Sequence, residues 1–200
     1  PVNAVFRNAE VRYGGVAGEG QIVAGMGDYL FDSVAVSSGS ARGFFLFGSS
    51  VTIQNSTTTL NSSHGINMAS GPNAQLYLSG NVISRNNGSA VLINPDIKLS
   101  GFGNSVFGNG LNALEFNPGA ISRDTTWTDL GMPYAIRSGD VVVDNSTLTV
   151  TAGVIVKMLS YKINYTGSGS LNLLGTAGKP VIFTSLRDDT AGGDTNGDGS

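Results

Sequence analysis

Three columns of similar residues repeat along this chain with the same uneven spacing. The first column begins with a small residue, followed by an apolar, a variable and a second apolar residue, and its segments start at Gly43, Gly65, Ala90 and Ala113, which lie 22, 25 and 23 residues apart. The second column starts at Asn8, Ser33, Asn55, Gly80 and Gly103. The third column is polar and consists of Asn61, Asn86 and Asn109, again 25 and 23 residues apart. A chain with such repeats folds as stacked units, because one unit cannot bury its apolar face alone.

Each apolar segment alternates in the way that a strand with one buried face alternates. A repeat of 22–25 residues accommodates three short strands joined by turns, whose backbone groups pair with the units before and after. We therefore predict an all-β fold, a right-handed parallel β-helix (a β-solenoid) with coils of about 22–25 residues.

The polar column has two interpretations. Stacked Asn61, Asn86 and Asn109 can donate amide hydrogen bonds from coil to coil and form a structural ladder, since a buried amide needs such partners. Alternatively, these asparagines only favour the turns in which they lie. We expect the ladder.

The composition excludes several classes of protein. Charged residues make up 12% of the chain, with three Glu and four Lys, so the surface helices of a helical bundle or an ordinary α/β enzyme are not expected. There is no cysteine, which excludes disulfides and zinc–thiolate sites. The formal net charge of −3 argues against nucleic acid as a partner, and no apolar run is long enough to span a membrane.

The repeat also predicts how the chain is organised. We expect residues 1–200 to form a single β-helix segment that belongs to a longer array. Within it, residues 1–116 form regular coils, 117–133 an irregular connection that carries the single Trp, 134–183 further coils and 184–200 a polar Asp/Gly loop.

Several segments of the second half resemble one family. They are Ser138–Val143, Thr147–Lys157, Gly175–Ser185 and Gly192–Ser200, and the opening Phe6–Gly15 resembles another coil of the same proteins. These stretches are similar to bacterial secreted or cell-surface right-handed parallel β-helix repeat proteins, with the architecture of the pectate-lyase-like superfamily. The resemblance implies an extracellular repeat protein. It implies no particular activity.

One segment carries a metal-ligand pattern. Asp194, Asn196 and Asp198, followed by Gly199 and Ser200, match the D-x-[DN]-x-[DN]-G opening of a calcium loop. The glutamate expected at the end of such a loop is missing, and Asp188 and Asp189 are candidates to replace it. The hypothesis is a Ca²⁺ site, and the alternative is a solvated acidic loop. No other cofactor is expected.

The outward positions of the aligned strands form a candidate binding face. We expect Phe45, Asn67, Leu92 and Glu115 to lie outward, beside a second outward column of the small residues that start each segment. β-Helix lyases and hydrolases place clusters of acids and bases on such a face, but Glu115 is a single carboxylate without a partner on a neighbouring coil. We therefore assign no catalytic residue.

These observations predict a non-enzymatic role. We expect an extracellular structural or adhesive rod, at the cell surface or in a matrix or fibre. One alternative is a module that binds or cleaves carbohydrate, and another is a subunit of a head-to-tail filament. The corresponding partners are a glycan, a cell-surface molecule or a second copy of the chain.

Overall fold

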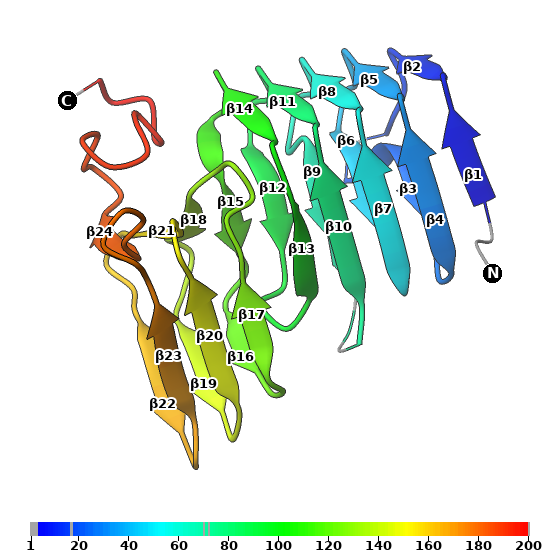
Figure 1. The fold of residues 1–200 in the computed structure, drawn as a ribbon. Helices are drawn as coiled ribbons and strands as arrows, with labels where there is room; N and C mark the ends of the chain where they lie inside the picture. The colour runs from blue at the N-terminus through cyan, green and yellow to red at the C-terminus, as the bar shows by residue number, and fades with distance from the viewer. Residues whose placement is uncertain (1–3, 17, 70, 72, 200) are drawn as a thin grey trace.

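The computed structural model of the chain describes residues 4–16, 18–69, 71 and 73–199. Within these residues the chain forms strands and no helix, and each named strand pair is parallel. The strands stack as the walls of a solenoid, and the chain winds right-handed from the blue N-terminal end to the orange C-terminal coil (Figure 1). The predicted all-β parallel β-helix is confirmed.

The first half of the solenoid has three walls. Sheet A contains β1 (Ala4–Arg7), β4 (Asp28–Asp32), β7 (Ser50–Gln54), β10 (Gln75–Ser79) and β13 (Lys98–Phe102). Sheet B contains β2 (Glu10–Arg12), β5 (Ala35–Ser37), β8 (Thr57–Thr59), β11 (Val82–Ser84) and β14 (Ser105–Phe107). Sheet C begins with β3 (Gly20–Ala24), β6 (Arg42–Leu46), β9 (Ile66–Met68), β12 (Ser89–Ile93) and β15 (Leu111–Phe116).

The second half keeps sheet C and exchanges the other two walls. Sheet C continues through β18 (Tyr134–Ile136), β21 (Ile155–Met158) and β24 (Ile182–Ser185). Sheet D contains β16 (Gly119–Ile121), β19 (Val141–Asp144) and β22 (Ile163–Thr166). Sheet E contains β17 (Thr125–Trp127), β20 (Thr147–Thr151) and β23 (Ser170–Leu174). With one sheet C strand in each coil, the eight strands of sheet C define eight coils.

The exchange of walls takes place between β13 and β17, and we call this place the step. Strand β17 packs against β13, so sheet E continues the side of the solenoid that sheet A forms. Sheet D is a new wall, which arises where the described residues of the first half form turns between sheets C and A. The segment 117–133 contains both β16 and β17. The prediction that it is an irregular connection was therefore wrong, because its strands pair with the coil that follows.

The strand registers agree with the sequence columns. Phe45 pairs with Asn67, Asn67 with Leu92 and Leu92 with Glu115. The residues that start the second column all have left-handed backbones, with φ of 49° at Asn8, 58° at Ser33, 50° at Asn55, 61° at Gly80 and 66° at Gly103. Asn and Gly tolerate that conformation best, which explains why these residue types recur there.

The core is a file of apolar side chains inside the coils. It runs along sheet C through Phe44, Ile66, Val91, Leu114, Tyr134 and Val156, all buried. At the step, the buried Trp127 stacks on Phe116 at 4.7 Å and on Tyr134 at 5.3 Å between ring centroids. Aromatic stacking therefore fills the core where the cross-section changes.

The predicted asparagine ladder is present at the bend between sheets B and C. The Nδ2 of Asn61 donates to the Oδ1 of Asn86 at 2.8 Å, and the Nδ2 of Asn86 donates to the Oδ1 of Asn109 at 2.9 Å. All three residues are buried. A second ladder at the bend between sheets A and B joins Asn81 to Asn104 at 2.9 Å.

Candidate functional site

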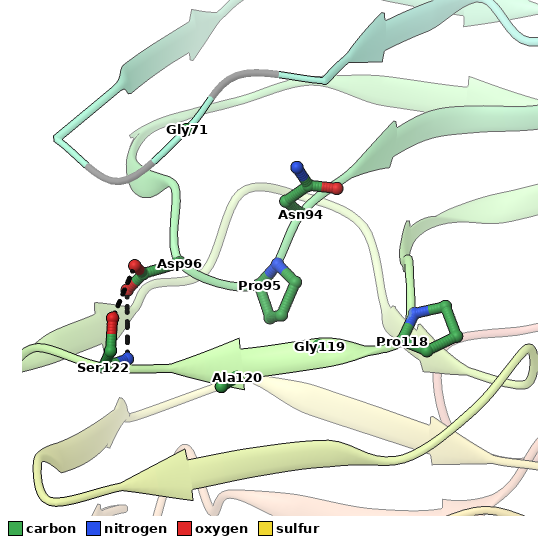
Figure 2. Close-up of a pocket in the computed structure, with 8 residues that line it drawn as sticks. All are labelled: Gly71, Asn94, Pro95, Asp96, Pro118, Gly119, Ala120 and Ser122. Carbon is green, nitrogen blue, oxygen red and sulfur yellow. Dashed lines mark hydrogen bonds between the residues drawn. The ribbon is translucent and has the colours of Figure 1, made fainter.

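A groove lies at the step, where β16 begins sheet D. Its volume is about 330 Å³, and it is lined by Gly71, Asn94, Pro95, Asp96, Pro118, Gly119, Ala120 and Ser122. Figure 2 shows Pro95 and Asp96 on the turn before β13 facing β16, with Pro118 at the far end. The groove exists because, over the described residues, no strand of the first half pairs with the outer edge of β16.

The polar groups of this groove are held in place. The carboxylate of Asp96 accepts from the Oγ of Ser122 at 2.9 Å and from its backbone N–H at 3.3 Å (Figure 2). Asp96 also forms an ion pair with the Nε of Arg123 at 3.6 Å. The Oδ1 of Asn94 accepts from the Nδ2 of Asn117 at 2.9 Å.

One backbone position of β16 is open to a ligand. Gly119 donates its N–H towards β19, to the carbonyl of Asp140, whereas the N–H of Ser122 points into the groove at Asp96. Backbone groups of alternate residues point to opposite edges of a parallel strand, so Ala120 presents its N–H and C=O to the groove. Pro95 faces this edge and has no N–H to offer it. The groove thus combines hydrogen-bonding groups with flat proline surfaces, which suits binding.

The predicted binding face is less open than expected. Asn67 is 4% exposed and Glu115 3% exposed, while Phe45 and Leu92 are half-buried. The expected outward column of small residues is buried, which corrects that prediction. A Cβ on Gly43 would lie 2.2 Å from the Oγ1 of Thr58 and 2.9 Å from the Nδ2 of Asn61, so the start of the strand faces the ladder.

The far end of this column is covered for a different reason. Ala113 packs with Leu111, Ala135 and Leu186, outside the main core. Leu186 belongs to the segment after β24, which folds back over the outer surface of sheet C. A flat exposed ribbon along sheet C is therefore absent over the described residues.

Glu115 is held by a network of hydrogen bonds. It accepts from the Nε of Arg137 at 3.1 Å, from the Oγ of Ser138 at 2.5 Å and from the Oγ of Ser89. Burial raises the pKa of Glu115, but the hydrogen bonds from Arg137, Ser138 and Ser89 outweigh it, and the pKa lies below its ordinary value. A carboxylate held ionised in this way is a poor general acid.

His64 lies near this network. Its Nδ1 accepts from the backbone N–H of Ser89 at 3.0 Å, and burial lowers the pKa of the imidazole. That bond fixes the ring in the turn between sheets B and C. The arrangement stabilises the turn rather than presenting a nucleophile and a base to a substrate.

The C-terminal acidic segment forms the second candidate site. Residues 186–199, which we call the strap, lie across the outer surface of sheet C. The buried ammonium of Lys157 donates to the carbonyls of Asp188 at 2.8 Å and Gly193 at 2.7 Å. Asn112 joins the strap at its far end, where its backbone N–H donates to the carbonyl of Thr195 at 2.8 Å.

Part of the predicted calcium-ligand set meets in the strap. Carboxylate oxygens of Asp189, Asp194 and Asp198 lie within 4.8 Å of one another, and Oδ1 of Asp189 is buried without a hydrogen-bond partner. Three carboxylates at this spacing can hold a hard cation.

The other predicted ligands have different roles or positions. Asp188 accepts from the hydroxyls of Thr184 and Thr190, which lower its pKa. The Nδ2 of Asn196 donates to Asp198 at 2.6 Å. Ser200 lies outside the described residues.

Sequence reasoning missed the groups that close the two ends of the first ladder. The Nε2 of Gln21 donates to the Oδ1 of Asn61 at 2.6 Å, and Asn112 accepts from the N–H of Asn109 at 2.9 Å. Asn112 reaches this position at a β-bulge between β12 and β15. The segment Leu111–Leu114 is one residue longer than the matching segment Ser89–Val91, and this difference was the signal available in the sequence for the bulge. The sequence carries no signal for the role of Lys157, because the partners of its ammonium are backbone carbonyls.

Comparisons with known proteins assign no family to this chain. The chain matches no protein-family model, no curated protein and no solved structure among those to which it was compared. Over the residues that the structure describes, no helix has the length and apolarity needed to cross a membrane.

Proposed function

We propose that this chain is an extracellular structural rod that serves adhesion or the building of a matrix or fibre. The observation that carries the proposal is the unbroken sheet C, whose eight strands join every coil along one side. Hydrogen bonds between its strands run parallel to the solenoid axis, as do the bonds of both asparagine ladders. Such an interior resists extension along the axis, which is a property of a load-bearing element.

The surface and composition support the same proposal. Charged residues are scarce, and the coils are joined by short turns whose backbone groups bond to the next coil. Protease cleavage requires an exposed, flexible backbone, so this construction favours long survival outside a cell. The resemblance of the second half to secreted β-helix proteins supports an extracellular location.

The structural role is tested by force and by proteolysis. We expect a single molecule held at both ends to resist pulling and then release coils in steps, and the folded chain to survive protease over the main body. Antibodies against the chain should label intact source cells or their medium. Extension at negligible force, or an intracellular location, would contradict the proposal.

A second candidate function is glycan binding at the step groove. The observation in its favour is the groove beside β16, where proline rings offer flat apolar surfaces and Ala120 offers backbone groups. Sugars present hydroxyls and apolar ring faces, which match those features. We propose binding rather than cleavage, because Glu115 is locked in hydrogen bonds and lies elsewhere.

Glycan arrays and an assay for released reducing ends test this candidate. We expect binding without release of reducing ends, and weaker binding for Asn94→Ala, which loses a groove amide. The exposed Asn87 is not part of the groove lining, and Asn87→Ala is the matched control. Equal binding by both variants would place the glycan elsewhere, and release of reducing ends would identify an enzyme.

A third candidate is a Ca²⁺ site in the strap. The observation in its favour is the meeting of Asp189, Asp194 and Asp198 around a buried, unpartnered carboxylate oxygen. We expect titration with Ca²⁺ to give heat and to raise the melting temperature, and Asp194→Asn to abolish both effects. Asp28→Asn, on sheet A, is the control. Unchanged melting in Ca²⁺ and in chelator would remove the candidate.

A further inference from the structure

Sheet B ends inside the molecule, at the step, and its last strand is β14 (Figure 1). In the coil that follows, Tyr134 pairs with Leu114 and β17 packs against β13. Residues 128–133 therefore connect the walls for which the preceding coil uses residues 103–113. This shorter segment forms no strand, so the outer edge of β14 has no partner strand within the described residues. We call this edge, residues 105–108, the ledge.

The apolar core is open at the ledge, although β14 lies in the middle of the chain. The inward residues Val36 and Ile83 of earlier sheet B strands are fully buried, whereas Val106, which pairs with Ile83, is half-buried. By contrast, Leu99 of β13, the strand against which β17 packs, is only 3% exposed. Phe107 is 46% exposed on the outer face of the ledge. An added strand would bury apolar surface on both faces.

Val106 also presents backbone groups to the ledge. The N–H of Ser105 donates to the carbonyl of Asn81, and the carbonyl of Phe107 accepts from the N–H of Arg85, so both residues direct their backbone groups towards β11. Alternate residues of a parallel strand direct these groups to opposite edges, so the N–H and C=O of Val106 point outward. Over the described residues, no strand or loop bonds to them. Such an edge accepts an extended strand by β-augmentation.

An arginine lies at the C-terminal end of the ledge. A Cβ on Gly108 would lie 3.4 Å from the Cγ of Arg85, so the stem of the arginine packs over the glycine. Both residues are exposed, and none of the ion pairs within the described part of the chain includes Arg85. On an added strand, the residue two positions after the one that faces Val106 would align with Gly108. An acidic side chain there would complement Arg85.

The chain's own sheet B strands do not supply that acid. Two positions after the inward residue of each earlier strand, the sequence has Tyr13, Ser38, Leu60 and Arg85. A second copy that added one of these strands would bring no negative charge to the ledge, and β11 would bring a second arginine. Charge therefore favours a different protein as the occupant.

We propose that the ledge binds an extended segment of a partner protein, which adds to β14 as a parallel strand. The segment places an apolar residue against Val106 and, two residues later, an aspartate or glutamate beside Arg85. This inference goes beyond the proposed structural role and does not depend on it, because it concerns a binding surface on the side of the solenoid.

Nuclear magnetic resonance titration with synthetic peptides tests the proposal. The probe copies residues 79–87 with Arg85→Glu, and the matched control peptide keeps the arginine. We expect the probe at millimolar concentration to slow solvent exchange of the Val106 amide. It should bind about two- to fivefold more tightly than the control, as expected for an exposed ion pair. The chain variant Arg85→Glu should prefer the arginine peptide, whereas Lys98→Glu, at an exposed lysine at the start of β13, should keep the wild-type preference.

N-methylated peptides separate strand addition from simple charge attraction. In a parallel pair, the residue after the apolar one donates its N–H to the carbonyl of Val106, while the N–H of the apolar residue points away. Methylation of the first N–H should abolish binding, and methylation of the second should leave it intact.

The proposal is wrong if the probe leaves the Val106 amide unchanged, if both methylated peptides bind equally, or if the preference does not follow the charge at position 85. Protection of that amide in the chain alone, together with a mass that increases with concentration, would identify a second copy as the occupant and also overturn it. A chain that binds neither peptide but resists force and protease would reject the ledge site and leave the structural role intact.

Discussion

An asparagine side chain suits a solenoid bend because its amide both donates and accepts between adjacent coils. Asn86 uses this capacity fully. Its Oδ1 accepts from the N–H and the Nδ2 of Asn61, while its Nδ2 donates to Asn109 and to the carbonyl of Thr58. Each of these groups is buried away from water, so each relies on the Asn86 side chain for its hydrogen bond.

We predict that Asn86→Ala lowers the free energy of unfolding by about 2–4 kcal/mol, because it orphans several buried polar groups that cost about 1–3 kcal/mol each. The neighbouring Asn87 is exposed, and Asn87→Ala should change stability by no more than about 0.5 kcal/mol. Urea unfolding of the two variants measures the difference. Equal losses would show that the ladder adds nothing to stability.

The Glu115 network gives stability a pH dependence. Burial alone would raise the pKa of Glu115, but hydrogen bonds from Arg137, Ser138 and Ser89 hold it below the ordinary value of 4.5. A carboxyl with a depressed folded pKa contributes stability above its unfolded pKa. That contribution is lost as pH falls through the folded pKa.

We therefore predict that Glu115→Gln destabilises the chain at pH 7 by about 1–3 kcal/mol and flattens the loss of stability below about pH 4.5. Urea unfolding between neutral and acidic pH measures both effects. Glu19→Gln, at an exposed carboxylate, is the control and should follow the wild-type profile. An unchanged acid slope in Glu115→Gln would show that other groups set it.

At the scale of elements, the strap depends on one buried cation. Burial lowers the pKa of Lys157, while the carboxylates of Asp188, Asp189, Asp194 and Asp198 act in the opposite direction. The ammonium holds the carbonyls of Asp188 and Gly193, which lie on either side of the turn of the strap. A neutral side chain of similar length fills the space but makes neither bond.

We predict that Lys157→Met releases the strap, so that protease cuts within residues 186–199 while the coils stay intact. Mass spectrometry of the digest locates the cuts. Lys98→Met, at an exposed lysine on sheet A, should leave the digestion pattern near the C-terminus unchanged. Protection of the strap in Lys157→Met would mean that Asn112 and Leu186 suffice to hold it.

The elements that sequence could predict are those that repeat. Asn61, Asn86 and Asn109 share one chemical role in successive coils, so their spacing is visible, and it led to the coils, the register and the ladder. The step and the strap occur once. They depend on contacts such as Trp127 with Phe116 or Lys157 with Gly193, for which no periodic signal exists. The candidate groove at the step could not be predicted for the same reason.

At the scale of the whole molecule, the step decides whether the two halves unfold together. Coils of a solenoid contact only their neighbours, so coupling passes through each coil in turn. Sheets A and B end at the step and sheets D and E begin there, so sheet C and the core continue across it, together with polar contacts such as those of Asp96 with Ser122 and Arg123. Trp127 lies in that core, fully buried and stacked on both Phe116 and Tyr134, which also stack on each other.

We predict that Trp127→Ala splits the unfolding of the chain into two transitions, since loss of a buried tryptophan costs about 3–5 kcal/mol and falls on the coil where the walls change. Leu148→Ala, at a buried residue of sheet E, removes core volume within the second half and should shift a single transition without splitting it. Hydrogen exchange followed by mass spectrometry distinguishes the cases, because it reports residues 4–116 and 134–185 separately. If both variants unfold as one body, sheet C and the polar contacts at the step suffice to couple the halves, and the aromatic stack serves only to fill the core.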